Sequence, residues 1–263
     1  MTPYPTALTV AGSDSGGGAG LQADLKTFAA HGVFGMTVVT AVTAQSSRGV
    51  TRVDPVPVEG MIAQLRAVFA DFPVGVVKVG MLGSAGHAAA LAEVLEELAE
   101  RPPVVLDPVL VASTGQRLTD DAAVAVVRDR LLPLSTLATP NRDEAAVLAD
   151  GRDVEAWALA ASCPVLVTGG DVVGDEIVDR WFAGGTLRRT WRHPRQGTRP
   201  FHGTGCTLAS AVAARIACGD EPERAIDGAI GWLQQLIAET VRTGSVGHGN
   251  PSLHHATRAL RAR

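Results

Sequence analysis

Residues 7–30 read ALTVAGSDSGGGAGLQADLKTFAA, and this stretch decides the fold class. Four of its first five residues are apolar, and glycine follows them, which is typical of a short buried strand. The glycine-rich segment 12–20 predicts a tight turn, because glycine adopts backbone conformations that other residues avoid. Residues 20–30 then show the apolar spacing of a helix. The stretch therefore predicts a strand, a loop and a helix, the unit from which parallel sheets are built.

The same alternation of short apolar runs and longer amphipathic segments continues along the chain. Further strands are predicted at residues 36–42, 75–79, 104–106, 136–138 and 165–167, and further helices at 58–69, 85–100, 121–131, 207–218 and 221–243. Residues 177–182 and 186–191 flank two glycines and predict an antiparallel hairpin at a sheet edge. We expect a single α/β domain over residues 1–263, with a mostly parallel sheet covered by helices on both faces.

Composition excludes several classes of protein. The net charge of −4 gives no basic surface of the kind that binds nucleic acid. No apolar run approaches the roughly 20 residues that a membrane-spanning helix needs, and the N-terminus has no signal-peptide pattern. The three cysteines lack the CxxC spacing of a structural zinc site. Their small, odd number favours a reducing cytoplasm.

Polar and glycine-rich segments follow the predicted strands at the points where the strands end. These segments are residues 12–20, 43–45, 80–81, 107–109, 139–141 and 168–170. Parallel α/β sheets bind ligands beyond the carboxyl ends of their strands. We therefore expect the six segments to lie along one rim of the sheet, where residues 203–206 can join them.

Gly203, Thr204, Gly205 and Cys206 stand directly before the helix-permissive run TLASAVAARIAC at residues 207–218. Glycines at a loop-to-helix junction let backbone N–H groups converge, and the helix dipole adds partial positive charge there. This arrangement predicts an anion site with an ionisable thiol at its edge. The alternative is an ordinary turn before a helix, with Cys206 as a small buried apolar residue.

Two polar side chains on the expected rim are candidates for ligand contact. Asp24 lies one turn into the predicted helix after the glycine-rich loop, and Gln45 directly follows a predicted strand. A carboxamide both donates and accepts hydrogen bonds, which suits a heterocycle. The alternatives are an acid favoured by the helix dipole and a loop amide bonded to backbone. The glycine-rich loop matches neither a Walker A sequence nor GxGxxG.

Asp107 and Glu144 are candidate carboxylates for magnesium. Proteins hold Mg²⁺ through one or two carboxylates, with water and substrate phosphates completing the coordination. The alternatives are an ordinary strand-end residue for Asp107 and a helix N-terminal acid for Glu144.

Together these motifs resemble the hydroxymethylpyrimidine kinase/phosphomethylpyrimidine kinase family, which makes the pyrimidine half of thiamine. The segments that carry the resemblance are AGSDSGGGAGLQADLKTF (11–28), TAVTAQSSRGV (40–50), VKVGML (77–82), VVLDPVLVASTG (104–115), TPNRDEAAVL (139–148), FHGTGCTLASA (201–211) and VGHGNPSLHH (246–255). The resemblance implies a ribokinase-like three-layer α/β/α sandwich and a homodimer. It also implies that ATP and Mg²⁺ drive phosphorylation of 4-amino-5-hydroxymethyl-2-methylpyrimidine, and then of its monophosphate to the diphosphate.

The resemblance also assigns roles to individual residues. Around the pyrimidine it places Gly12, Asp24, Gln45, Met81 and Val109, and near ATP it places Asn141, Thr168 and Gly170. Asp107 and Glu144 are placed near the metal. The anion hole is assigned to Gly203, Thr204 and Gly205, beside Cys206 as the general base. Because a helix N-terminus stabilises a thiolate, we expect the pKa of Cys206 to be lowered. Thr168 departs from the family, whose members often carry at this position a lysine that acts as a point charge on ATP phosphates.

Two other functions fit many of the same residues. The first is pyridoxal kinase activity, alone or as dual specificity, although Gln45 and Met81 favour the pyrimidine. The second is a non-catalytic pyrimidine-binding protein that lost turnover along with the lysine. Cys206, Asp107 and Glu144 argue against the second.

Overall fold

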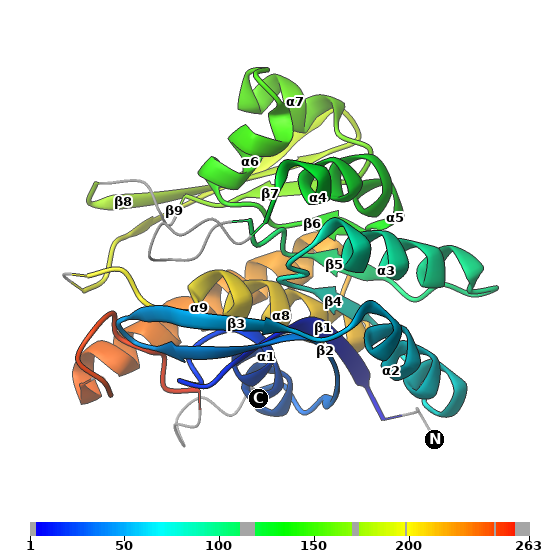
Figure 1. Ribbon diagram of the computed structural model, residues 1–263. Coiled ribbons are helices and arrows are strands. Elements are labelled where there is room, and N and C mark those ends of the chain that lie inside the picture. Colours follow the sequence, from blue (N-terminus) through cyan, green and yellow to red (C-terminus); the bar gives the residue numbers. More distant parts are fainter. Residues whose placement is uncertain (1–3, 111–118, 170–173, 198, 245, 256–263) are drawn as a thin grey trace.

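In the computed structural model, one sheet of nine strands forms the middle layer of the molecule (Figure 1). The structure describes residues 4–110, 119–169, 174–197, 199–244 and 246–255. The strand order is β3-β2-β1-β4-β5-β6-β7-β8-β9. β1 (Thr6–Asp14) pairs in parallel with β2 (Phe34–Ser46) on one side and with β4 (Val77–Val79) on the other. The direction of chain progression reverses at β1, which is where sheets of this type bind ligands.

The parallel part of the sheet continues through three short strands. These are β5 (Val104–Leu106), β6 (Leu137–Ala138) and β7 (Val165–Val167). All their residues are apolar and buried, as expected for strands covered on both faces. The prediction of a mostly parallel sheet is confirmed.

Both edges of the sheet are antiparallel. β8 (Glu176–Ala183) and β9 (Thr186–Pro194) form the predicted hairpin. At the other edge, β3 (Gly49–Pro55) pairs with β2, and this strand was not predicted. Most of β3 is exposed, so it lacks the apolar run by which buried strands are recognised.

Helices cover both faces of the sheet and complete the expected three-layer α/β/α sandwich (Figure 1). One face carries α2 (Val58–Asp71), α3 (Ala85–Glu97), α4 (Asp121–Val126), α5 (Leu132–Leu134), α6 (Arg142–Ala149) and α7 (Val154–Ala160), and the other carries α1 (Gly20–Ala30), α8 (Thr204–Ala217) and α9 (Pro222–Thr243). Successive strand residues point to opposite faces, so Leu8 enters the first core and Ala7 the second. Within the described residues, no helix combines the length and the apolar character needed to cross a bilayer.

Two predicted helices differ from the observed ones in their details. The segment predicted at 121–131 is helical, but its last five residues form a π-helix, η1 (Val127–Leu131). Apolar spacing alone does not distinguish this turn from an α-helical one. The helix predicted from residue 207 begins three residues earlier, at Thr204. Thr204, Gly205 and Cys206 therefore belong to the first turn of α8.

Candidate active site

The anion loop, defined here as Gly203, Thr204, Gly205 and Cys206, lies where α8 begins. Gly203 is the N-cap residue and has a left-handed backbone with φ of +82°. A Cβ at this position would overlap the carbonyl oxygen of Gly18, so glycine lets the two loops pack together. The four N–H groups at this end have no partner within the helix. They and the positive end of a 14-residue helix suit an anion.

Gly203→Ala is expected to lower the free energy of unfolding by about 1–3 kcal/mol, and to lower kcat with it. The variant combines a strained backbone with a steric overlap, so the anion loop has to shift. Urea denaturation and a turnover assay measure the two effects. Gly219→Ala is the matched control, because Gly219 has φ of +93° and no atom within 4 Å of a built Cβ. Equal losses in both variants would contradict the assigned role of close packing against Gly18.

A buried ionic cluster lies on the face of the sheet that α1 and α8 cover. Lys78 of β4 is fully buried, with its Nζ 3.1 Å from Asp24 Oδ1 and 3.4 Å from Asp107 Oδ2. Burial alone would lower the pKa of Lys78, but the carboxylates of Asp24 and Asp107 raise it above its usual value. Lys78 is therefore a charged ammonium inside the protein.

The expectation that Asp24 contacts a ligand is corrected by this cluster. Asp24 is 0% exposed. Its oxygens accept hydrogen bonds of 2.6 Å from the hydroxyls of Thr9 and Ser210, and a further bond from Lys78. The Asp24 side chain therefore lies between α1, α8 and the sheet, where Thr9, Ser210 and Lys78 surround it. The carboxylate of Asp24 compensates the buried ammonium.

The expected lowering of the Cys206 pKa is wrong. Cys206 is half-buried and lies near the ammonium of Lys78 and the carboxylates of Asp107 and Asp24. Burial raises the pKa of the thiol to about 12, and the carboxylates of Asp107 and Asp24 add to this effect against the opposing charge of Lys78. The helix N-terminus stabilises a thiolate less than burial beside two carboxylates destabilises it. Cys206 therefore carries its proton at neutral pH.

Asp107 and Glu144 do not offer magnesium a set of free oxygens. Asp107 Oδ2 accepts no hydrogen bond from the described residues, but it lies 3.4 Å from the ammonium of Lys78, whose positive charge opposes a cation beside it. The Glu144 oxygens accept hydrogen bonds from the backbone N–H groups of Asn141 and Leu110, at 3.0 and 3.3 Å. Among the described residues, no group of three or more His, Cys, Asp or Glu side chains is placed to hold a metal. Direct coordination by these two carboxylates has no support in this geometry, and Glu144 fits a role through water.

Three of the residues expected around the pyrimidine lie at the ends of neighbouring strands. A Cβ on Gly12, within β1, would meet the Met81 side chain beyond β4. The hydroxyl of Thr40 donates to the Met81 carbonyl at 2.7 Å and fixes that segment. Val109 follows β5 in a turn where its N–H donates to the Asp107 carbonyl at 2.8 Å. The rim inferred from the sequence is therefore present at β1, β4 and β5.

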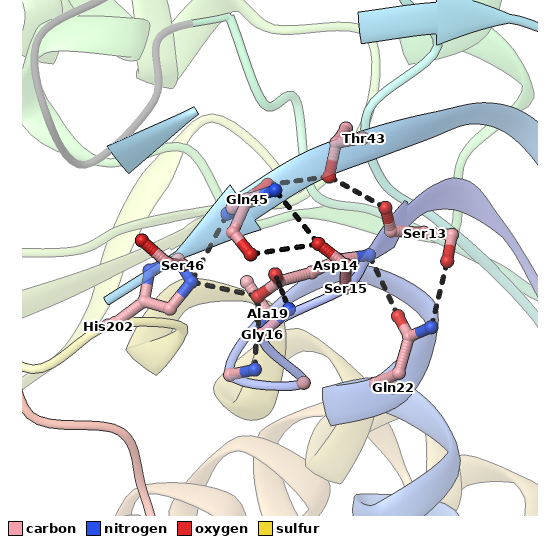
Figure 2. Close-up of polar contacts among 12 residues, drawn as sticks. Ser13, Asp14, Ser15, Gly16, Ala19, Gln22, Thr43, Gln45, Ser46 and His202 are labelled. Atoms are coloured by element: carbon pink, nitrogen blue, oxygen red, sulfur yellow. Dashed lines mark hydrogen bonds and ion pairs between the residues drawn. The ribbon is translucent and has the colours of Figure 1, made fainter. Parts of the chain in front are cut away.

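Gln45, the fourth of these residues, belongs to a polar network that Figure 2 shows in close-up. Its Nε2 lies 3.2 Å from Nε2 of His202, and that nitrogen lies 2.9 Å from Oδ2 of Asp14. Asp14 also accepts hydrogen bonds from the backbone N–H groups of Gly16, Gly18 and Ala19. Burial alone would raise the pKa of Asp14, but the hydrogen bond from His202, followed by those from Ala19 and Gly16, lowers it. An ionised carboxylate thus holds the glycine-rich loop in shape.

The residues expected near ATP lie side by side beyond β6 and β7. Asn141 and Thr168 form a parallel bridge, and the Thr168 N–H donates to the Pro140 carbonyl at 2.9 Å. Asn141 caps α6 by accepting a hydrogen bond from the Glu144 N–H at 2.8 Å. Gly170 lies outside the described residues.

Sequence reasoning missed three residues of this site: Lys78, Asp14 and His202. Lys78 stands among valines in a predicted buried strand, in a chain with only two lysines against 21 arginines. That placement was an available signal, because a buried lysine needs partners. Asp14 lies within the glycine-rich loop, and His202 directly precedes Gly203. Their contact could not be inferred from the sequence, because the two residues are 188 positions apart.

Comparisons with known proteins agree with this geometry. The sequence profile of the family described as phosphomethylpyrimidine kinase matches residues 14–252. A Rhizobium meliloti (strain 1021) protein named hydroxymethylpyrimidine/phosphomethylpyrimidine kinase is 44% identical over 95% of this chain and 96% of its own. An ADP complex of Bacillus subtilis pyridoxal kinase has a TM-score of 0.86 and 30% identity, covering 97% of this chain and 98% of that one. Phosphomethylpyrimidine kinase from Clostridium difficile 630 has a TM-score of 0.76 and 33% identity, covering 88% and 99%. The chain belongs to the phosphomethylpyrimidine kinase family.

Proposed function

We propose that the protein transfers the γ-phosphoryl group of ATP to the hydroxymethyl group of 4-amino-5-hydroxymethyl-2-methylpyrimidine, and then to the phosphate of the monophosphate formed. The observation that carries the proposal is the anion loop, with the Cys206 thiol in its first helical turn. The His202 contact links this loop to Gln45 on the expected pyrimidine side. The names of the relatives support the choice of pyrimidine as substrate.

In the proposed mechanism, the anion loop stabilises the negative charge on the transferring phosphoryl group. Its N–H groups and the end of α8 supply fixed positive partial charge without reorganisation. Because Cys206 already carries a proton, it can take the hydroxyl proton only by giving up its own. The acceptor of the thiol proton in this relay is Asp107. One O–H bond breaks, the S–H bond is renewed, and the proton ends on the carboxylate. Burial raises the pKa of Asp107, which suits it to hold that proton.

The nucleotide is proposed to lie along Asn141 and Thr168, on the rim beyond β6 and β7. The Thr168 hydroxyl can donate a hydrogen bond to a phosphate oxygen. When bound with ATP, Mg²⁺ would neutralise charge on the phosphates. Glu144 would contact this cation through water, because both of its oxygens already accept backbone hydrogen bonds.

A coupled ADP-release assay with the pyrimidine alcohol, its monophosphate and pyridoxal as separate substrates tests the proposal. Both pyrimidines are expected to give kcat/KM values at least about tenfold above that of pyridoxal. Faster turnover of pyridoxal would establish the second candidate function, which the pyridoxal kinase neighbour at a TM-score of 0.86 favours. Calorimetric binding of the pyrimidine with no ADP formed would instead establish a non-catalytic binding protein.

The proposal extends to a homodimer that acts in the cytoplasm. Both properties come from the resemblance to the family. Sedimentation equilibrium is expected to give the mass of two chains, and a mass of one chain would contradict this part of the proposal.

A further inference from the structure

Three polar side chains from distant segments meet in the network of Figure 2, and one of them belongs to the residue directly before the anion loop. Asp14 comes from the end of β1, Gln45 from β2, and His202 from the residue before Gly203. Asp14 and His202 are only 2% and 7% exposed. Buried polar groups are costly unless each finds a hydrogen-bond partner, so the donors and acceptors of this network are tightly constrained.

The contact between His202 and Asp14 fixes the first proton. An ionised carboxylate can only accept, so His202 Nε2 carries a hydrogen and donates it to Asp14 Oδ2 at 2.9 Å. A protonated nitrogen cannot accept from an amide N–H. The end of the Gln45 carboxamide that lies 3.2 Å from this nitrogen is therefore its oxygen, since the two ends of an amide are assigned from their partners.

The other end of the same amide leads independently to the same orientation. Thr43 has one hydroxyl proton, which it donates to the Ser13 carbonyl at 2.8 Å. The Thr43 oxygen also lies 3.1 Å from the Gln45 side chain, where it can then only accept. An N–H group of Gln45 therefore faces Thr43, and the carboxamide oxygen faces His202.

We propose that His202 is a positioning residue that fixes the carboxamide of Gln45 for recognition of an aminopyrimidine. The shared Nε2–H holds the carboxamide oxygen, and Thr43 holds one N–H. The amide keeps one N–H and one oxygen lone pair, which match the ring nitrogen and the exocyclic amino group of such a substrate. This inference depends on the proposed function, because it takes Gln45 as the residue that faces the pyrimidine. It makes His202 a specificity determinant, since pyridoxal has no such pair of groups.

Steady-state kinetics of His202→Phe test the inference, because phenylalanine keeps a ring but removes the donor. KM for the pyrimidine alcohol is expected to rise about tenfold or more, the usual loss when a buried hydrogen bond is removed. KM for ATP should stay within about twofold of the wild-type value, and His202→Gln, which restores an N–H donor, should recover most of the loss. His87→Phe is the matched control: His87 is 4% exposed and also bonded, but its partners are Ser84 and Val56.

An unchanged KM for the pyrimidine alcohol in folded His202→Phe would overturn the inference. So would a rise in the KM for pyridoxal by the same factor, since that would indicate general damage to the site. If His202→Phe does not fold, Thr43→Val removes the other anchor of the amide and must raise the KM for the pyrimidine alcohol. The wild-type enzyme distinguishes failure of this inference from failure of the proposed function. If the proposed function is wrong, the wild-type enzyme itself will not turn over the pyrimidine alcohol.

Discussion

Cys206→Ala is expected to lower kcat for the pyrimidine alcohol by roughly two to four orders of magnitude, the usual contribution of a general base. KM should change little, because the thiol is assigned to proton transfer rather than to binding. The second reaction has a different acceptor. A phosphate monoester has a second pKa near 6, so at about pH 8 its oxygen has no proton to lose. Phosphorylation of the monophosphate is therefore expected to fall by about tenfold or less.

The test compares the loss of kcat in the two phosphorylation reactions, measured with one preparation of the Cys206→Ala enzyme. Cys218→Ala is the matched control, because Cys218 is exposed and lies at the opposite end of α8. Equal losses in the two reactions would assign Cys206 to anion binding instead of proton removal. Retention of most activity toward the alcohol would remove Cys206 from the mechanism.

Lys78→Met is expected to lower the free energy of unfolding by about 3–5 kcal/mol near pH 7.5, as measured by urea denaturation. The substitution leaves the carboxylates of Asp24 and Asp107 buried together without their cation. The loss should shrink as the pH falls. Burial raises the pKa of Asp107 in the folded protein, so the folded state binds this proton more tightly than the unfolded state, and acid relieves the repulsion.

Lys26→Met, the only other lysine substitution available, is the control for this experiment. Lys26 is exposed and donates to the Gly17 carbonyl at 2.7 Å, so its loss should cost about 1 kcal/mol or less. Lys78→Arg is expected to restore little stability, because a guanidinium is larger than the ammonium packed against Gly80. Equal losses for Lys78→Met and Lys26→Met would contradict the assigned ionic cluster.

Much of the fold followed from patterns within single segments. Short valine-rich strands and amphipathic helices were visible locally, and the ribokinase-like arrangement expected from the resemblance agrees with the solved neighbours. The exposed strand β3 was missed because it has no apolar face. The expectation that Gly12, Met81 and Val109 lie along one rim is confirmed, because they stand near the end of β1 and just beyond β4 and β5.

The errors in the site came from contacts that no local pattern contains. The sequence around Cys206 indicates the start of a helix. The pKa of the Cys206 thiol, however, depends on Lys78, Asp107 and Asp24, which come from other parts of the chain. Asp24 was expected to contact a ligand, whereas the partners that bury its carboxylate, Ser210 and Lys78, are 186 and 54 positions away in the sequence. Electrostatics and burial at this site are tertiary properties.

The order of elements has a consequence for how the chain is made. The nine strands described here all end by Pro194, whereas α8 and α9 occupy the final quarter of the sequence. A ribosome that has reached residue 200 has produced every strand of the sheet, while Val105, Leu137 and Leu166 still lack the two helices that later cover them. The nascent polypeptide is therefore most prone to aggregate late in translation. A message truncated before residue 204 would encode a sheet with one apolar face uncovered and without the anion loop.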